Sequence, residues 1–266
     1  MNQETTIQDT KIGRSFGEKA GVYHQKAEIQ RKVANGLIAS LKPWKEIVPS
    51  GPILEIGCGT GVLSELLVPE FKDRDFLFTD LSERMLEQCE KNLEKAGLKT
   101  DKISFQTYDV NQAELDSQYS LIISNFAVQW FDDAALGLEK LTAHLKPGGL
   151  LLSSFPGEKS FPEWYQKCLE LGLPYTANEL PNVEKVGIHL SMGSLQIDFF
   201  ENEIKQQFDS SMDFFRHLKE LGASESLNDK HLRPDQFRLL TRHWDQSLNK
   251  PEITWHIVYL AAKKDG

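Results

Sequence analysis

A short glycine-rich stretch constrains the fold of this chain more than any other feature of its sequence. In residues 52–67, PILEIGCGTGVLSELL, a short apolar run leads into glycines at positions 57, 59 and 61, and an amphipathic run follows. The apolar run is typical of a buried strand, and the amphipathic run is typical of a helix. Glycines between them let a ligand approach the backbone closely. The stretch therefore predicts an α/β fold with a nucleotide-like ligand at the loop.

Strands and helices continue to alternate beyond this loop. The predicted strands of this part lie at 52–56, 76–80, 103–110, 119–125 and 150–155. The predicted helices lie at 25–41, 61–70, 82–97 and 132–149, the last one closed by Pro147, Gly148 and Gly149. Such alternation predicts a parallel sheet with right-handed crossovers.

The rhythm changes after residue 155. Helices are predicted at 161–172, 210–224 and 234–248, with an extended segment at 194–208 and a final strand at 252–263. The predicted organisation has four parts: a helical lid over 1–48, a ligand-binding core over 49–155, a helical insertion for substrate or partner over 156–248, and the final strand of the core sheet over 249–266. A chain of 266 residues is long enough for one domain with such an addition.

The spacing of the glycines selects between classes of ligand. A dinucleotide fingerprint, GxGxxG, needs a third glycine where Val62 stands, and a phosphate-binding P-loop ends in GK[ST]. The loop also contains no lysine or arginine to balance a pyrophosphate. Glu55, at the end of the predicted strand, suits a positively charged ammonium group. These residues favour an amino acid joined to a nucleoside.

Two more carboxylates stand at the ends of the next two predicted strands. Asp80 can accept both hydroxyls of an unphosphorylated ribose, while Leu81 and Met85 can pack on an adenine face. Asp109 stands at the end of the third strand and can accept the adenine amino group. Ligands of open α/β sheets bind at the carboxyl ends of the strands, so these side chains predict one shared site.

At this point the chain resembles the class I S-adenosylmethionine-dependent methyltransferases, on residues 54–61, Asp80, Asp109 and the LKPGG of 145–149. The resemblance implies a Rossmann-like seven-stranded sheet whose last strand is antiparallel, with S-adenosylmethionine across the strand ends and no metal. Cys58 has no base near it in sequence, so we expect its backbone, not its thiol, to matter. The predicted cofactor-binding residues are Gln30, Glu55, Gly57, Cys58, Gly59, Gly61, Asp80, Leu81, Met85, Asp109, Val110 and Asn125.

A more distinctive likeness covers most of residues 14–262. The segments RSFGEKAGVYHQKAEIQRKVANGL (14–37), IISNFAVQWFDD (122–133), FPEWYQKC, MDFFRHLKELGAS and ITWHIVYLAAK resemble the malonyl-acyl-carrier-protein O-methyltransferases of biotin synthesis. In that family the free carboxylate of a malonyl thioester attacks the sulfonium methyl. A carboxylate is ionised at neutral pH, so no acid or base residue is expected. The candidates for orienting the substrate are Tyr23, Asn125, Gln129 and Trp130.

The implied partner is an acyl carrier protein bearing a malonyl group. Carrier proteins are acidic and this chain has a formal net charge of -9, so we expect a local basic face. The candidate residues for that face, and for the acceptor carboxylate, are Arg216, Arg233, Arg238 and Arg242.

Other features exclude some classes of partner and leave two rival functions. The net charge argues against nucleic acid. No apolar run approaches the roughly 20 residues that span a bilayer. The polar N-terminus and three scattered cysteines predict a cytoplasmic protein. The rivals are a methyltransferase for a small carboxylate such as trans-aconitate, whose enzymes carry a similar Asn–x–x–x–Gln–Trp segment, and a non-catalytic S-adenosylmethionine-binding protein.

Overall fold

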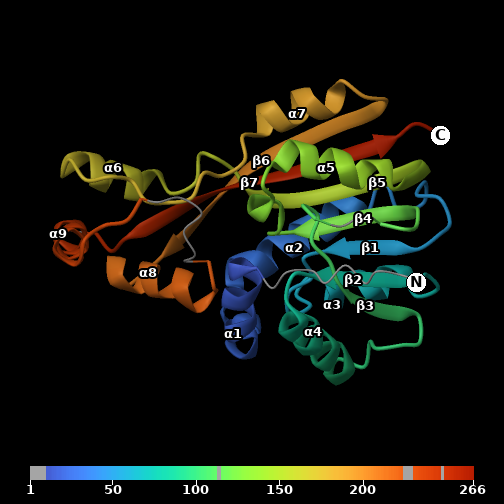
Figure 1. The fold of residues 1–266 in the computed structure, drawn as a ribbon, viewed down its shortest axis with the longest axis horizontal. Coiled ribbons are helices and arrows are strands. Elements are labelled where there is room, and N and C mark those ends of the chain that lie inside the picture. Colours follow the sequence, from blue (N-terminus) through green and yellow to red (C-terminus); the bar gives the residue numbers. More distant parts are fainter. Residues whose placement is uncertain (1–9, 113–114, 224–229, 247–248) are drawn as a thin grey trace.

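The computed structural model describes residues 10–112, 115–223, 230–246 and 249–266. These residues contain one seven-stranded sheet of order β3-β2-β1-β4-β5-β7-β6 (Figure 1). The strands are β1 Ile53–Ile56, β2 Phe76–Asp80, β3 Ile103–Thr107, β4 Tyr119–Asn125, β5 Leu145–Pro156, β6 Leu195–Gln207 and β7 Glu252–Lys264. Neighbouring strands from β3 to β5 are parallel, and β7 runs antiparallel to both β5 and β6.

Helices cover both faces of this sheet and extend beyond one of its ends. They are α1 Lys11–Lys26, α2 Glu28–Leu41, α3 Ser64–Leu67, α4 Glu83–Lys95, α5 Ala134–Ala143, α6 Pro162–Glu170, α7 Val183–Ser191, α8 Ser211–Glu220 and α9 Pro234–Asp245. Two short 3-10 helices, η1 Val68–Phe71 and η2 Val128–Trp130, complete the set in the described part of the chain. None of the described helices has both the length and the apolar character needed to cross a membrane.

The two faces of the sheet carry separate apolar clusters because side chains alternate along a strand. Ile53 and Leu121 join a cluster with α2 and α4, whereas Leu54 and Ile122 join a cluster with α5 and α7. The central strands therefore bury both faces, as their continuous apolar sequences require.

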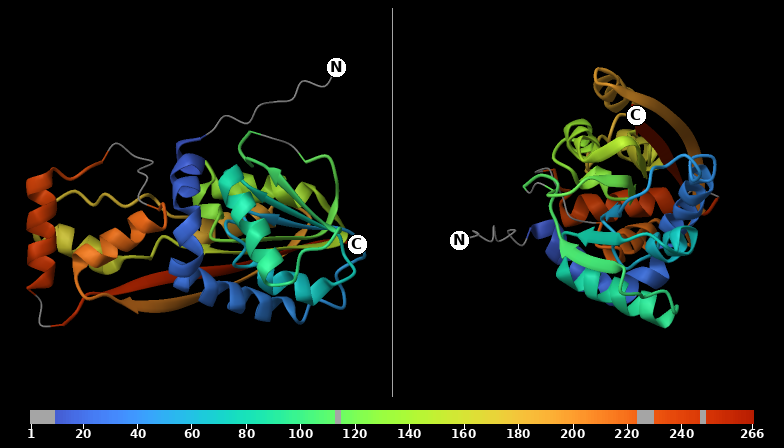
Figure 2. Two further views of the ribbon diagram at one scale, coloured as in Figure 1. Left: turned by 90° about the horizontal axis from the view of Figure 1, so that it is seen from below. Right: turned by 90° about the vertical axis from the view of Figure 1, so that its right-hand side faces the viewer.

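A third cluster of aromatic residues holds together a lobe made of α6, α8, α9 and the first part of β7. Phe161 and Trp255 meet edge to face, and Phe214 contacts Trp164 and Trp244. The lobe lies in the direction in which the arrows of β1 and β4 point (Figure 1). Helix α1 packs against α4 of the sheet domain and α8 of the lobe, and stands between these two parts in Figure 2 (left).

The predicted fold class is confirmed, including the antiparallel final strand. The predicted extended segment at 194–208 is β6, so the region 156–248 supplies an edge strand to the sheet as well as helices. The proposed boundaries between parts of the chain stay predictions. The helix ends predicted at residues 224 and 248 lie outside the described residues.

Three local predictions were wrong. The helix predicted over 132–149 ends at Ala143, and residues 145–149 already belong to β5, where Leu145 pairs with Tyr119 before a register shift. The helix predicted over 25–41 begins at Glu28, because the non-helical backbone of the buried Ala27 separates it from α1, which was not predicted. Helix α7 was also missed.

Candidate functional site

The glycine loop follows β1 as predicted, and its backbone explains the glycines. Gly57, Gly59 and Gly61 have φ values of 67°, 55° and 90°, which other residues rarely adopt. The Cys58 N–H donates to the Thr79 carbonyl of β2 at 2.8 Å. The loop is thereby held against the carboxyl end of the neighbouring strand.

Asp80 ends β2 directly beside this loop. Its Oδ2 accepts a hydrogen bond from the Gly59 N–H and its Oδ1 accepts one from the Ser82 N–H, both at 2.9 Å. Burial raises the pKa of Asp80 to about 6, although these backbone donors oppose the rise. The carboxylate is therefore ionised at neutral pH and has a fixed orientation toward the loop.

Glu55 lies in β1 and is 1% exposed. Its Oε2 accepts a hydrogen bond from the Ser64 Oγ at 2.7 Å, which ties the strand to the start of α3. Burial is the main cause that raises the pKa of Glu55 to about 8. Without a cation beside it, this carboxyl group is mostly protonated at neutral pH, and an ammonium group brought into contact would favour its ionised form.

This raised pKa predicts how stability depends on pH. The folded protein holds a proton on Glu55 up to about pH 8, whereas an unfolded chain loses it near pH 4.5, the ordinary pKa of a glutamate side chain. The stability that Glu55 contributes is therefore full below pH 4.5 and is lost as the pH rises toward 8. Glutamine mimics the protonated form, so we expect ligand-free Glu55→Gln protein to match the wild type at pH 4.5 and to melt at a higher temperature than the wild type at pH 8. Thermal melting across that range checks this; a difference between the two proteins that stays constant with pH contradicts it.

Most of the predicted cofactor-binding residues line one cavity over the strand ends, called here the loop cavity. Gly61 is the exception: a Cβ there would lie 3.0 Å from the Cys89 Sγ, so this glycine faces α4. The predicted residues that line the loop cavity are Gln30, Glu55, Gly57, Cys58, Gly59, Asp80, Leu81, Met85, Asp109, Val110 and Asn125.

Asp109 and Cys58 show how two of these side chains are held. Asp109 is 3% exposed and accepts hydrogen bonds from the Asn111 N–H and the Gln112 Nε2, each at 2.8 Å. Burial, with the neighbouring Cys89 as a second cause, raises the pKa of the Cys58 thiol well above its usual range. A thiol that stays protonated is a poor nucleophile.

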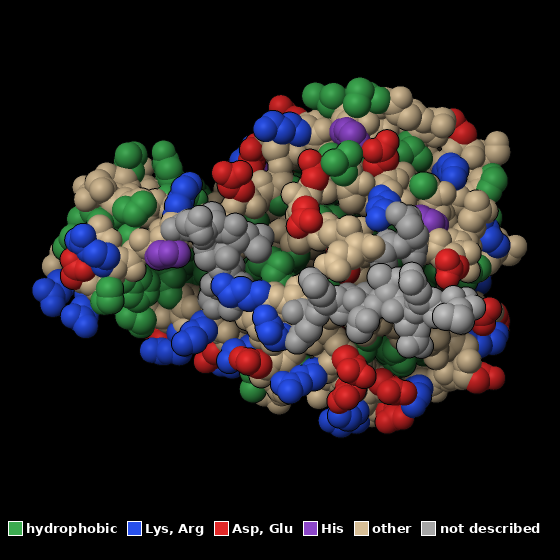
Figure 3. Space-filling view, in the orientation of Figure 1, with side chains coloured by type: hydrophobic (Ala, Val, Ile, Leu, Met, Phe, Trp, Pro, Cys, Tyr) green, Lys and Arg blue, Asp and Glu red, His purple; other side chains and the backbone are tan. Residues whose placement is uncertain are grey.

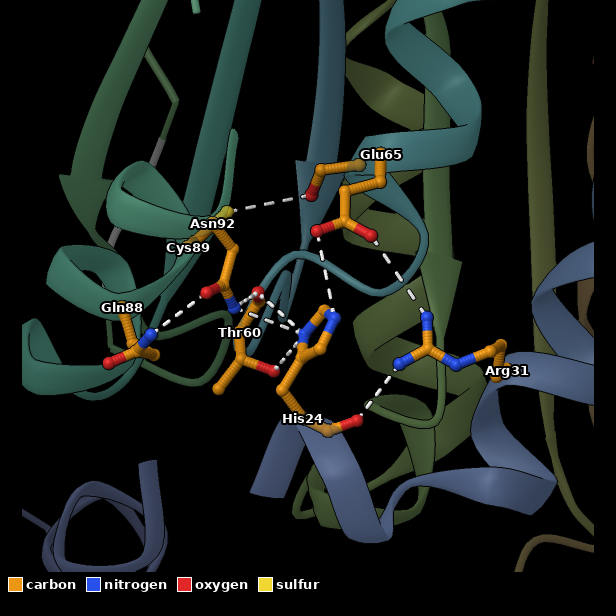
Figure 4. A network of polar contacts seen from close by, with 8 residues as sticks. His24, Arg31, Thr60, Glu65, Gln88, Cys89 and Asn92 are labelled. Atoms are coloured by element: carbon orange, nitrogen blue, oxygen red, sulfur yellow. Dashed lines mark hydrogen bonds and ion pairs between the residues drawn. The ribbon is translucent and has the colours of Figure 1, made fainter. Parts of the chain in front are cut away.

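A polar network fastens α1 to the glycine loop (Figure 4). The Asn92 Nδ2 of α4 donates to the Thr60 carbonyl at 2.9 Å and lies 3.1 Å from the His24 Nδ1. The His24 Nδ1 lies 3.1 Å from the Thr60 Oγ1, and its Nε2 lies 3.6 Å from the Glu65 Oε1. No pattern in the sequence predicted these contacts, because the residues that make them come from helices and a loop that are far apart in the chain.

Helices α1 and α2 also supply side chains to the cavity. Tyr23 lines it, and burial followed by the charge of Asp80 raises the pKa of its phenol, so the hydroxyl stays protonated. Phe16 packs edge to face on Trp130, with ring centroids 5.3 Å apart. The Asn125 Nδ2 donates to the Gln30 carbonyl at 3.1 Å, which joins α2 to the end of β4.

A second cavity of about 740 Å³ adjoins the first and reaches into the aromatic lobe; it is called here the lobe cavity. The two cavities share Phe16, Tyr23, Gln30, Phe126 and Trp130. Phe126 has a φ of 59°, a strained conformation that often occurs at functional sites. The sequence did not single out Phe126, because backbone strain leaves no pattern in residue types.

Of the candidate orienting residues, Tyr23 and Trp130 line both cavities, Asn125 lines the loop cavity and Gln129 lines the lobe cavity. The Gln129 Nε2 donates to the Phe126 carbonyl at 2.8 Å. The geometry thus gathers these four side chains where the cavities meet.

The four candidate arginines are not gathered in one place. Arg216 lines the lobe cavity, and its Nη1 donates to the Asp213 Oδ1 at 2.5 Å. Arg233 pairs with Asp235 at 3.1 Å outside the cavity lining. Arg238 and Arg242 are exposed one helical turn apart on α9 and, among the described residues, have no ion pair.

Comparisons with known proteins show what this chain is similar to. A family model for a methyltransferase domain matches residues 54–151. A malonyl-[acyl-carrier protein] O-methyltransferase of Magnetococcus marinus is 31% identical over 253 residues, which covers 94% of this chain and 90% of that protein. A second one, of Ilyobacter polytropus, is 30% identical and covers 97% of this chain and 99% of its own.

Solved structures share the fold at low sequence identity. Magnesium protoporphyrin IX methyltransferase from Synechocystis, with bound SAH, is 13% identical with a TM-score of 0.57, and the match covers 91% of this chain and 86% of that one. The YcgJ protein from Bacillus subtilis is 14% identical with a TM-score of 0.60, covering 87% and 99%.

Proposed function

This chain belongs to the family of malonyl-[acyl-carrier protein] O-methyltransferases, and on that premise we propose that it methylates the free carboxylate of a malonyl group carried by acyl carrier protein. S-adenosylmethionine is the proposed methyl donor, and biotin biosynthesis is the proposed pathway. The observation that supports this proposal most strongly is the pair of adjoining cavities: one is lined by carboxylates at the strand ends, and the other is lined mainly by aromatic and aliphatic side chains.

The loop cavity fits the donor in three places. In this proposal the carboxylate of Asp80 accepts the ribose hydroxyls, Glu55 binds the ammonium of the methionine part, and Asp109 with Val110 binds the adenine. When bound, S-adenosylmethionine supplies an electrophilic methyl group on a sulfonium. Gly57 and Gly59 have no side chains, so such a ligand could lie in close contact with the loop backbone.

The acceptor would lie where the cavities meet. Its carboxylate is already ionised at neutral pH, so the protein's task is to orient it and exclude water. The protonated Tyr23 hydroxyl is a donor for that carboxylate, and Trp130 with Phe16 forms an apolar wall. Asn125 holds α2 over this junction through the Gln30 carbonyl.

Genetic complementation tests the proposal as a whole. We expect the gene to restore growth of a biotin-requiring strain that lacks its own malonyl methyltransferase, and the Asp80→Asn variant to fail. No growth with soluble, folded wild-type protein would contradict the proposed acceptor. Methylation of trans-aconitate in place of malonyl carrier protein would favour the alternative function, a methyltransferase for a small carboxylate. The cytoplasmic location and the absence of nucleic-acid and membrane partners stay predictions.

We further propose that α9 presents the basic face for the carrier protein. Several Lys and Arg side chains lie on the lobe in Figure 3, although the whole chain has a net charge of -9. Reversing both charges in Arg238→Glu/Arg242→Glu is expected to lower kcat/KM for malonyl carrier protein by about 10-fold, since complementary charges steer association. The loss for malonyl-pantetheine should be much smaller.

Steady-state kinetics with both acceptors checks this prediction. Lys72→Glu/Lys102→Glu is the matched control, because both lysines are exposed near the amino ends of β2 and β3, away from the lobe. Equal losses for the two acceptors in the α9 variant, or an equal loss in the control, would refute docking at α9.

A further inference from the structure

The described lining of the lobe cavity carries basic residues and no acidic ones, although the whole chain is acidic. Acidic residues outnumber Lys and Arg by 39 to 30 in the whole sequence. Yet its described lining contains Arg216, Lys219, Lys230 and His231, and no Asp or Glu. The other lining residues are mainly aromatic and aliphatic. An apolar cavity with a cluster of cationic groups fits a mostly uncharged ligand that carries an anion.

The cationic groups in the lining of this cavity are exposed to solvent. Arg216 and Lys219 are three residues apart on α8, so they share one helix face. Tyr23, Gln30 and Trp130 line the cavity where it adjoins the loop cavity. A ligand that reaches from this junction to the cations would lie against the apolar side chains of the lining.

One ion pair orients the Arg216 side chain and leaves most of its N–H donors available. One of its amino groups donates to Asp213, whose other oxygen accepts from the Ser210 Oγ at 2.7 Å. The Arg216 side chain is 60% exposed, so its remaining N–H groups face solvent. Lys219 makes no ion pair with any described residue. A planar guanidinium beside an ammonium is well suited to a phosphate group.

The cavity is also larger than the acceptor group alone requires. Its volume of about 740 Å³ lies well inside the roughly 300–1,000 Å³ of sites that bury drug-sized ligands. A malonyl group fills a small part of that space. The pantetheine arm that carries such a thioester is long, uncharged and ends in a phosphate, which matches a mainly apolar cavity with exposed cationic groups in its lining.

We propose that Arg216 and Lys219 form a phosphate subsite at the mouth of the lobe cavity, which binds the phosphate of the pantetheine arm and so sets the depth to which the thioester enters. This subsite rests on the proposed function. The phosphate subsite is distinct from the proposed carrier-docking face on α9, because it binds the phosphate of the pantetheine arm and not the carrier protein.

Two matched acceptors isolate the phosphate. We expect kcat/KM for malonyl-4′-phosphopantetheine to exceed that for malonyl-pantetheine by about 10-fold in the wild type, the size of one charge-assisted contact. In Arg216→Gln/Lys219→Gln this ratio should fall to about 1. Malonyl-coenzyme A carries the same arm phosphate and should show the same loss. Lys72→Gln/Lys102→Gln, which removes two charges far from the lobe, should keep the wild-type ratio.

The outcomes separate the subsite from the function. A wild-type ratio near 1, or a ratio that persists in the Arg216/Lys219 variant, overturns the subsite while the methyl transfer stands. The subsite is also overturned if kcat/KM exceeds that of malonyl-pantetheine for malonyl-coenzyme A but not for malonyl-4′-phosphopantetheine. The cations would then bind the nucleotide part of coenzyme A. If neither pantetheine thioester is methylated although malonyl carrier protein is, the arm alone does not reach the junction and the subsite falls. If no malonyl thioester is methylated, the proposed function fails and the subsite with it.

Discussion

Replacing Asp80 with alanine is expected to weaken the binding of S-adenosylhomocysteine by about 100-fold or more. The variant loses an ionised acceptor for two ribose hydroxyls, and a hydrogen bond to a charged group contributes about 1.5–3 kcal/mol. It also frees the N–H groups of Gly59 and Ser82, which the Asp80 carboxylate now holds at 2.9 Å. The loop would then lose the orientation that the ligand needs.

Isothermal titration calorimetry measures this loss directly. Asp75→Ala is the matched control, because Asp75 is an exposed carboxylate that precedes β2 at the opposite end of the strand. It should bind as tightly as the wild type. Asp80→Ala protein that keeps its affinity within about 3-fold would show that Asp80 does not contact the ligand.

Replacing Gly57 with alanine should have the second largest effect, on stability and on the site together. Gly57 has a φ of 67°, and a Cβ there would lie 2.5 Å from the Ala127 Cβ. Ala127 directly precedes η2, which carries Gln129 and Trp130, so relieving the clash moves both cavities. We expect the affinity for S-adenosylhomocysteine to fall at least 10-fold and the protein to lose about 2 kcal/mol of stability or more.

Gly97→Ala provides the control for backbone strain alone. Gly97 has a φ of 69°, close to that of Gly57, but a Cβ there would meet no atom within 4 Å. It should cost about 1 kcal/mol and leave ligand binding unchanged. Denaturant unfolding and calorimetry on both variants measure the difference. Equal effects on binding would show that the contact with Ala127 is irrelevant to the site.

The sequence predicted the loop cavity better than the lobe cavity, for a physical reason. The glycine loop, Glu55, Asp80 and Asp109 each lie at or beside a strand end, and parallel strands bring their carboxyl ends to one edge. The positions of these residues at the ends of predicted strands were therefore enough to predict that their side chains line one cavity. The prediction for Gly61 was wrong, because this residue does not line the loop cavity. Its glycine is explained by its positive φ and by its close packing against Cys89.

The lobe cavity depends on packing between distant segments. Phe16, Phe126, Phe237 and Trp255 meet there from four separate parts of the chain, and no spacing in the sequence joins them. Arg216 was a candidate only as one basic residue among several, because nothing in the sequence showed that it would line this cavity. Helix α7 was missed although it carries an N-cap, Asn182, whose side chain accepts from the Lys185 N–H. Gly187 lies in the middle of this short helix, and a glycine inside a helix weakens the helical pattern.

The proposed reaction transfers a methyl group from S-adenosylmethionine to a malonyl group on acyl carrier protein. Intact-protein mass spectrometry of malonyl carrier protein, incubated with the enzyme and isotopically labelled S-adenosylmethionine, detects this transfer. We expect the carrier to gain one labelled methyl group, and the Asp80→Ala enzyme to transfer far less at the same concentration of S-adenosylmethionine. An unmodified malonyl carrier protein, in a reaction where the wild-type enzyme demonstrably binds S-adenosylhomocysteine, would contradict it.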